Sequence, residues 1–236
     1  MTDDDYPPPP PVFLSPGAPP EAQSLLDRWN EQWPGRHPWR SSARDARPDA
    51  VVRFHTLPNG GQELRHNRDA RTVSRKFRRI VRATEHVTGL PAAVIIMADE
   101  RSLGDCRDLI RSTVPGLRPW VTDPYPFPND DDDVVIDDGP ASPLESHSFR
   151  SGPVDDDMLT ALTRLVHYFD ADFMILPEDL SWAASTYDGG VDVVLRTAAE
   201  AEALADLFTD WLPPEGWGGF HTWCRDATPR ERRLLS

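Results

Sequence analysis

The sequence predicts an α/β (α+β) domain with a mixed sheet of about five or six strands and helices packed on it. Segments with strand-like and helix-like hydrophobic patterns alternate along the chain. The run Ala92 to Met97 is apolar throughout, which is typical of a strand buried on both faces. In the stretch 181–195, SWAASTYDGGVDVVL, Asp188-Gly189 indicates a two-residue β-hairpin turn, because a type I′ turn needs positive φ at both central residues. Gly190 leaves a three-residue loop with a bulge as the alternative.

The length of 236 residues and the 39% apolar content are enough to bury a sizeable core. We expect a single domain over residues 20–214. The acidic, proline-rich segment 1–19 before it is expected to be a disordered tail, and a proline-rich ligand for an aromatic groove is its functional alternative. An acidic loop is expected as an insertion at 123–142, and residues 215–236 form a C-terminal extension.

In the first half of the chain, helical and strand patterns follow each other closely. Leu25, Trp29 and Trp33 recur at helical spacing before Pro34-Gly35 ends the helix. Residues 50–57 alternate as a half-buried strand does. From 70 to 87, apolar residues mark one helix face and arginines mark the other, with Asp69 as the expected N-cap.

In the second half, a short helix is expected at 105–114, followed by an extended, proline-broken segment. The chain then offers short strands at 134–136 and 144–149, a helix over 156–169 that aspartates cap, and a strand at 171–176. After the hairpin, Thr197 and Glu200 fit a capping box at the start of an amphipathic helix that Pro213 stops.

The basic residues exclude several enzyme classes. Of the 25 lysines and arginines, only Lys76 is a lysine, a skew that we expect of a GC-rich bacterial genome. The chain therefore has no phosphate-binding P-loop and offers little basis for a Schiff-base lysine. The metalloprotease, serine-hydrolase and dinucleotide-binding motifs are also absent from the sequence.

Charge and cysteine content bear on compartment and partners. The formal charge of −14 disfavours nucleic acid and anionic membranes and favours a cationic partner. Cys106 and Cys224 are far apart, so we expect two reduced thiols. No apolar run is long enough to span a bilayer, and the acidic N-terminus does not resemble a secretion signal. We expect a cytoplasmic protein with no cofactor.

Two motifs resemble those of a bacterial family of small proteins that is known only as a domain of unknown function. The first is R-F-H-x-L-P, matched here by Arg53 to Pro58. The second is W-x-x-x-P-Y-D-G-G-x-D-V before a helix that ends in W-L, matched by Trp182, Tyr187 to Gly190, Asp192-Val193 and Trp211-Leu212. The chain departs from the pattern at Thr186, by one extra residue after the tryptophan, and by insertions around 124–138. The resemblance covers about residues 50–215 and implies no activity, substrate or catalytic residue.

The densest charge cluster suggests a docking site. It comprises Asp130, Asp131, Asp132, Asp133, Asp137 and Asp138. Aligning Gly139 with the glycine of an EF-hand loop puts Val134 and Ile136 at carboxylate positions, so the calcium motif fails and we assign no metal. His221 and Cys224 lack a second pair for zinc. The open interpretations are a solvated loop or an acidic surface that binds a cationic partner.

The helix over 70–87 carries a second charged surface, which is basic. Its arginines are Arg71, Arg75, Arg78, Arg79 and Arg82. Guanidinium groups suit phosphate, so nucleic-acid binding is one hypothesis, although interleaved aromatic residues for base stacking are missing. A solvated face, or pairing with the protein's own aspartates, is the structural alternative.

Polar residues near strand ends give the only candidates for catalysis. His55, Asp188 and Asp192 could act as acid or base if they lie together. Turn geometry and an ordinary strand face explain the same residues without catalysis. The sequence therefore favours a non-catalytic, cytoplasmic interaction protein with an acidic docking loop. In size and expected compartment it resembles the immunity proteins that neutralise bacterial toxins. This analogy rests on general character and not on shared motifs. An enzyme of unfamiliar type and nucleic-acid binding are the alternatives.

Overall fold

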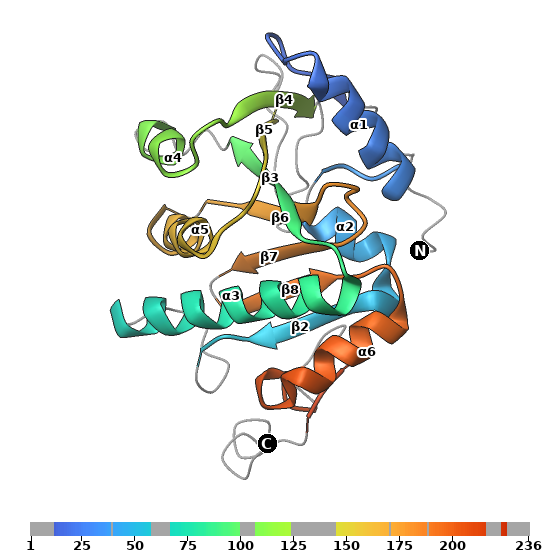
Figure 1. Ribbon diagram of the computed structural model, residues 1–236, viewed down its shortest axis with the longest axis vertical. Coiled ribbons are helices and arrows are strands. Elements are labelled where there is room, and N and C mark those ends of the chain that lie inside the picture. The colour runs from blue at the N-terminus through green and yellow to red at the C-terminus, as the bar shows by residue number, and fades with distance from the viewer. Residues whose placement is uncertain are drawn as a thin grey trace, which may run out of the picture.

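The computed structural model describes residues 12–38, 40–57, 67–99, 107–123, 145–169, 171–187, 189–215 and 223–225. Within these residues the chain forms one open sheet of eight strands, in the order β1-β4-β5-β3-β6-β7-β8-β2, with helices on both sides (Figure 1). The strands are β1 (Phe13–Leu14), β2 (Val51–His55), β3 (Ala92–Asp99), β4 (Arg118–Asp123), β5 (Glu145–Ser151), β6 (Phe173–Pro177), β7 (Ala183–Tyr187) and β8 (Gly190–Val194). The helices are α1 (Glu21–Gln32), α2 (Arg40–Ala46), α3 (Asn67–Thr88), α4 (Arg107–Thr113), α5 (Asp156–Phe169) and α6 (Ala198–Leu207).

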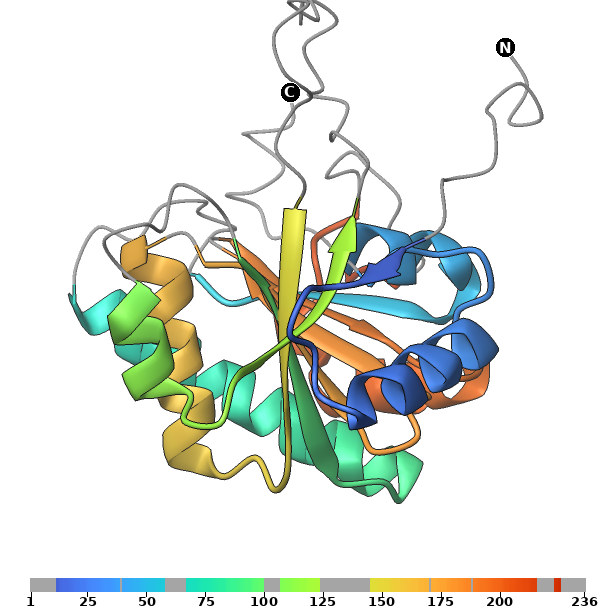
Figure 2. The same ribbon diagram turned by 90° about the horizontal axis from the view of Figure 1, so that it is seen from above.

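The sheet separates two hydrophobic clusters. One cluster joins the sheet to α3, α4, α5 and α6, and the other joins its opposite face to α1 and α2. Figure 2 shows α1, in dark blue, on the other side of the sheet from α3, α4 and α5. Because neighbouring strand residues point to opposite faces, β3 supplies Ile95 and Met97 to the first cluster and Val94 and Ile96 to the second. This confirms that the apolar run Ala92 to Met97 is a strand buried on both faces.

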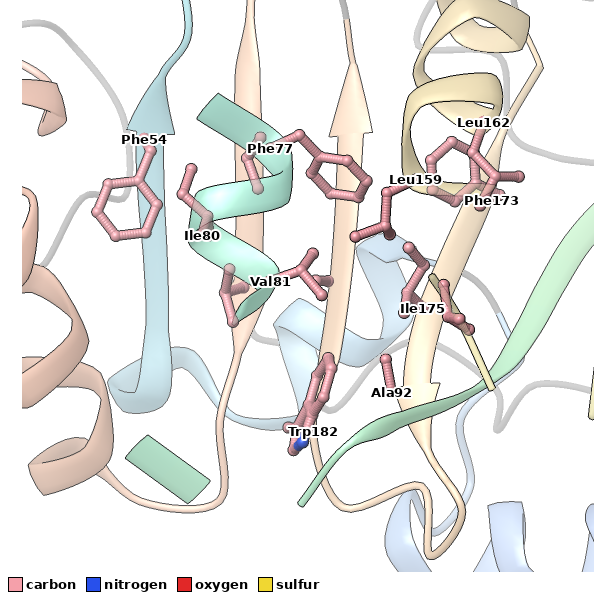
Figure 3. Packing of buried hydrophobic residues seen from close by; sticks show 14 of the residues in the cluster. Phe54, Phe77, Ile80, Val81, Ala92, Leu159, Leu162, Phe173, Ile175 and Trp182 are labelled. Atoms are coloured by element: carbon pink, nitrogen blue, oxygen red, sulfur yellow. The ribbon is translucent and has the colours of Figure 1, made fainter. Parts of the chain in front are cut away.

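The two longest helices form the first layer over the sheet. Phe77, Ile80 and Val81 from α3 lie beside Leu159 and Leu162 from α5, above the strands (Figure 3). All five side chains are fully buried. Each contributes about 1.5–3 kcal/mol by leaving water, so this layer fixes the two helices against each other and against the sheet.

Tryptophans fill the second layer. The rings of Trp29 and Trp33 in and after α1 stack with centroids 5.6 Å apart, and Trp120 of β4 meets Trp29 edge-on at 6.1 Å. The three indole N–H groups all donate to backbone carbonyls: Trp29 to Arg36 at 2.7 Å, Trp33 to Leu180 at 2.9 Å and Trp120 to Ala22 at 3.2 Å. The α1 layer is thus packed as a core.

Several local predictions are confirmed. Tyr187 pairs with Gly190, which leaves a two-residue hairpin loop rather than the three-residue alternative. The Thr197 side chain accepts a hydrogen bond from the backbone N–H of Glu200 at 3.2 Å, as a helix N-cap does. Asp155 likewise accepts from the N–H of Met158 at 2.8 Å and caps α5.

The sheet differs from the prediction in size and in direction. It has eight strands rather than five or six, and every pairing between its strands is antiparallel rather than mixed. β1 lies within the segment 1–19, which we expected to be a disordered tail, and its Leu14 packs on the second cluster. The strand at 134–136 lies outside the described residues.

Besides β1, two more short elements were not predicted as a strand or helix. β4 contains Pro119 beside a register shift and lacks regular alternation. Among the described side chains of α2 only Ala43 is buried, so no apolar stripe marks that helix. No helix in the described part of the chain is long and apolar enough to cross a membrane.

Candidate functional site

The two segments that carry the family resemblance meet at one edge of the sheet. β2 pairs with β8, and the register sets Arg53 opposite Asp192 and His55 opposite Gly190. β7 lies on the other side of β8 and sets Tyr187 opposite Gly190. Residues separated by more than a hundred positions in the sequence thus form one surface, on the face of the sheet that α1 and α2 cover.

The centre of this surface is an ion pair between Arg53 and Asp192. The Arg53 Nε and Nη2 atoms each donate to one carboxylate oxygen of Asp192 at 2.6 Å. Asp192 is only 7% exposed, and Nη1 of Arg44 in α2 lies 3.9 Å from its Oδ2 atom. The hydrogen bonds to Asp192 raise the pKa of Arg53 above its ordinary value, although burial opposes this. We call Arg44, Arg53, Tyr187 and Asp192 the β2–β8 polar cluster.

Tyr187 closes this cluster over Gly190. The Arg53 guanidinium carbon lies 5.2 Å from the centroid of the Tyr187 ring, within range of a cation–π contact. A Cβ atom on Gly190 would lie 2.8 Å from the Tyr187 hydroxyl and 2.5 Å from the carbonyl oxygen of Phe54. Glycine is therefore required here by the close approach of the neighbouring strand and ring.

His55 lies next to the polar cluster. Residues two apart on a strand share a face, so the side chains of His55 and Arg53 leave β2 on the same side as Asp192 leaves β8. The structure therefore brings two of the three candidate catalytic residues to one face, but the Asp192 carboxylate is bound by Arg53 at both oxygens. Asp188, the third candidate, lies outside the described residues.

Lys76 of α3 contacts the same strand end from the other face of the sheet. Its Nζ atom donates to the carbonyl of His55 at 3.0 Å and lies 4.9 Å from the centroid of the Trp211 ring. Burial lowers the pKa of Lys76 to about 8, with a further contribution from the positive charge of Arg75. The amine thus joins α3 to the end of β2.

The lowered pKa of Lys76 predicts a pH effect on stability. The unfolded chain keeps a lysine pKa near the ordinary 10.5, so between about pH 8 and 10.5 it binds more protons than the folded chain. The free energy of unfolding should therefore rise with pH across this window more steeply than in Lys76→Met. Urea unfolding of both proteins at pH 7.5, 9 and 10 measures the difference. Equal slopes would contradict the shifted pKa.

Three of the five candidate arginines on α3 have partners within the chain. Arg82 binds Asp156 at 2.9 Å and Glu85 at 2.7 Å, and Nη1 of Arg78 lies 3.7 Å from Asp156. The guanidinium of Arg79 stacks over the Trp211 ring at 4.9 Å. This part of the basic face is thus occupied by internal contacts.

The other two arginines face solvent. Arg71 and Arg75 are exposed and make no hydrogen bond or ion pair with another described residue. They lie in the first half of α3, away from the aspartates at the start of α5.

The predicted acidic docking loop lies outside the described residues. Its aspartates are Asp130, Asp131, Asp132, Asp133, Asp137 and Asp138. Within the ranges that the structure describes, no three His, Cys, Asp or Glu side chains gather closely enough to hold a metal ion.

Sequence reasoning missed the partner of Asp192. Arg53 was noted only as part of a motif. Its contact with Asp192 could not be predicted, because the two residues are 139 positions apart and meet only when β2 pairs with β8. Arg44 and Lys76 were missed for the same reason, since both contacts are long-range. The signal available was the matching alternation of residues 51–55 and 190–194, which is compatible with their pairing but does not require it.

No curated protein and no solved structure is significantly similar to the chain. A family model does match, over residues 39–215, and this segment contains α2 to α6 and seven of the eight strands together with the β2–β8 polar cluster. The match covers about three quarters of the sequence and confirms the resemblance to an uncharacterised family. The chain therefore belongs to the family described as the domain of unknown function DUF3885.

Proposed function

We propose that this protein works by binding a cationic macromolecular partner through its acidic segment, as an immunity-like protein does, and that it is not a catalyst. The segment comprises residues 124–144, between β4 and β5, and carries the six clustered aspartates. A surface of one sign attracts a partner of the other sign and orients its approach.

The observation that carries the proposal is the register of β4 and β5. Asp123, the last residue of β4, pairs with Glu145, the first residue of β5. Both ends of the acidic segment are therefore fixed as neighbours at one end of the sheet. Loops whose two ends are held by a scaffold commonly carry binding groups.

The chemistry of the β2–β8 polar cluster supports binding over catalysis. A catalytic base must be able to accept a proton from a substrate. The two oxygens of Asp192 already accept hydrogen bonds from Arg53, and the residue is nearly buried. This arrangement favours a structural role for Asp192 and leaves the enzyme hypothesis without a free carboxylate among the described candidates.

Affinity capture from an extract of the source organism tests the proposal. The immobilised wild-type chain is compared with a variant in which Asp130, Asp131, Asp132 and Asp133 are asparagine. We expect the wild type to retain a basic protein that the variant loses, since the substitutions remove four negative charges and leave the size of the side chains nearly unchanged. Retention should weaken as salt is raised, because salt screens charge pairs.

A matched control removes four negative charges from other surfaces. Asp27, Asp49, Asp206 and Asp210 are exposed and lie far from the acidic segment in the sequence. Their replacement by asparagine should leave capture unchanged. If wild type, variant and control retain the same proteins in the same amounts, the acidic segment is not the binding surface.

A further inference from the structure

A groove runs between α3 and α5 on the outer surface of the helical layer. Its volume is about 480 Å³, within the range of small-molecule sites. Each helix contributes one stripe of side chains at three- to four-residue spacing, as expected for one helix face. The lining residues are Ala70, Arg71, Ser74, Arg78, Thr160, Arg164 and Tyr168.

The groove is basic. Of the seven described residues that line it, three are arginines and none is acidic. Arg71 and Arg164 are exposed and make no hydrogen bond or ion pair with another described residue. Arg78 lies 3.7 Å from Asp156, which also binds Arg82, so that carboxylate does not neutralise all the positive charge around it.

Two buried polar atoms at the groove have no hydrogen-bond partner among the described residues. They are Oγ of Ser74, a residue that is 6% exposed, and Nε of Arg78. The hydroxyls of Thr84 in α3 and Thr160 in α5 each donate to the carbonyl four residues earlier, but that of Ser74 does not. Buried polar groups in folded proteins are nearly always paired, so these two donors call for an acceptor that the described residues do not supply.

We propose that the α3–α5 groove binds the phosphate group of a small phosphate monoester. Such a group carries close to two negative charges at neutral pH and has three acceptor oxygens. Arginine forks bind these oxygens in pairs, and the Ser74 hydroxyl and the Arg78 N–H supply two further donors. The proposal is independent of the acidic segment and of any macromolecular partner.

Tyr168 indicates what the rest of the ligand is. Its side chain is at the end of the α5 stripe and is 54% exposed, so one part of the ring is open to solvent. The groove is larger than a lone phosphate requires. A flat, apolar group attached to the phosphate would pack on the ring while the phosphate meets the arginines.

Calorimetric titration of the full chain with three probes tests the site at low ionic strength. The probes are phenyl phosphate, inorganic phosphate and benzoate. We expect phenyl phosphate to bind more tightly than inorganic phosphate because of Tyr168, and benzoate to bind at least about tenfold more weakly because it has one charge and two oxygens. No measurable binding of phenyl phosphate at 10 mM probe would overturn the proposal.

Substitutions separate a defined site from general attraction of anions. Arg71→Gln and Arg164→Gln should each lower the affinity for phenyl phosphate at least about tenfold, since each removes a charged donor. Arg75→Gln removes the same charge from an exposed position of the same helix that does not line the groove, and should leave binding unchanged. Equal weakening by Arg75→Gln and Arg71→Gln would contradict a defined site.

Ser74→Ala gives a readout that does not depend on charge. It removes a hydroxyl that has no partner among the described residues, so the unfolding midpoint of the unliganded protein should stay the same or rise. Affinity for phenyl phosphate should nevertheless fall. A variant that binds phenyl phosphate as well as wild type would show that the hydroxyl does not face the ligand.

A single-stranded oligonucleotide distinguishes a small phosphate ester from nucleic acid. A polyanion would use the whole arginine face, so its binding would fall steeply with salt and would respond to Arg75→Gln. Binding of the oligonucleotide far more tightly than phenyl phosphate, with that response, would replace our proposal by nucleic-acid binding.

Discussion

Replacing Asp192 with alanine is expected to lower the free energy of unfolding by about 3–5 kcal/mol, because it leaves the half-buried guanidinium of Arg53 without its counter-charge. Both hydrogen bonds of the pair are 2.6 Å long, and Asp192 is 7% exposed. Arg44, whose Nη1 atom lies 3.9 Å from the same carboxylate, is itself a cation and cannot replace the lost negative charge. Equilibrium unfolding in urea of wild type and Asp192→Ala measures the loss.

Two further variants show whether the loss comes from the unpaired charge. Arg53→Met combined with Asp192→Leu removes both charges and should recover part of the stability, since no buried charge is then left alone. Arg44→Ala should cost less than about 1 kcal/mol, because that ion pair is long and partly exposed. A cost below about 1 kcal/mol for Asp192→Ala would contradict a structural role for the pair.

Gly190→Ala is expected to lower the free energy of unfolding by about 2–3 kcal/mol, at the upper end of the cost of overpacking. The added methyl group would lie 2.5 Å from the carbonyl oxygen of Phe54 and 2.8 Å from the hydroxyl of Tyr187. The first contact is with the backbone of β2, so the methyl group fits only if β2 and β8 move apart. Thermal and urea unfolding measure the effect.

Removal of the ring separates the two contacts. Tyr187→Ala in the Gly190→Ala background abolishes the contact with the hydroxyl but keeps the contact with Phe54. Most of the loss in free energy of unfolding caused by Gly190→Ala should therefore remain when Tyr187→Ala is compared with the double variant. If this loss disappears, the contact with Tyr187, and not the close approach of β2, is the reason that glycine is required at position 190.

Elements with strong local signals could be predicted from the sequence. The hairpin follows from Asp188-Gly189, α6 begins where Thr197 caps it, and β3 is a continuous apolar run. β1 and α2 could not be predicted, because each is short and is held by contacts with distant segments rather than by a periodic pattern. The antiparallel direction of the whole sheet also depends on such contacts.

The candidate sites show the same limit. The sequence identified Asp192 and His55 as neighbours of interest, and the structure places both on one face of the sheet. It could not show that Arg53 occupies the carboxylate, since that contact requires β2 to pair with β8. The α3–α5 groove was missed because its two stripes come from helices about 70 residues apart, and only the arginines of α3 were considered.

We propose that the protein acts by binding through its acidic segment and not by chemistry at His55. The most direct test is the dissociation constant of the captured partner for three proteins: wild type, His55→Ala, and the variant with asparagine at Asp130 to Asp133. We predict equal affinity for wild type and His55→Ala, and a loss of at least about tenfold for the asparagine variant, since each surface charge pair contributes up to about 1 kcal/mol. Unchanged affinity in the asparagine variant together with a loss in His55→Ala would contradict the account.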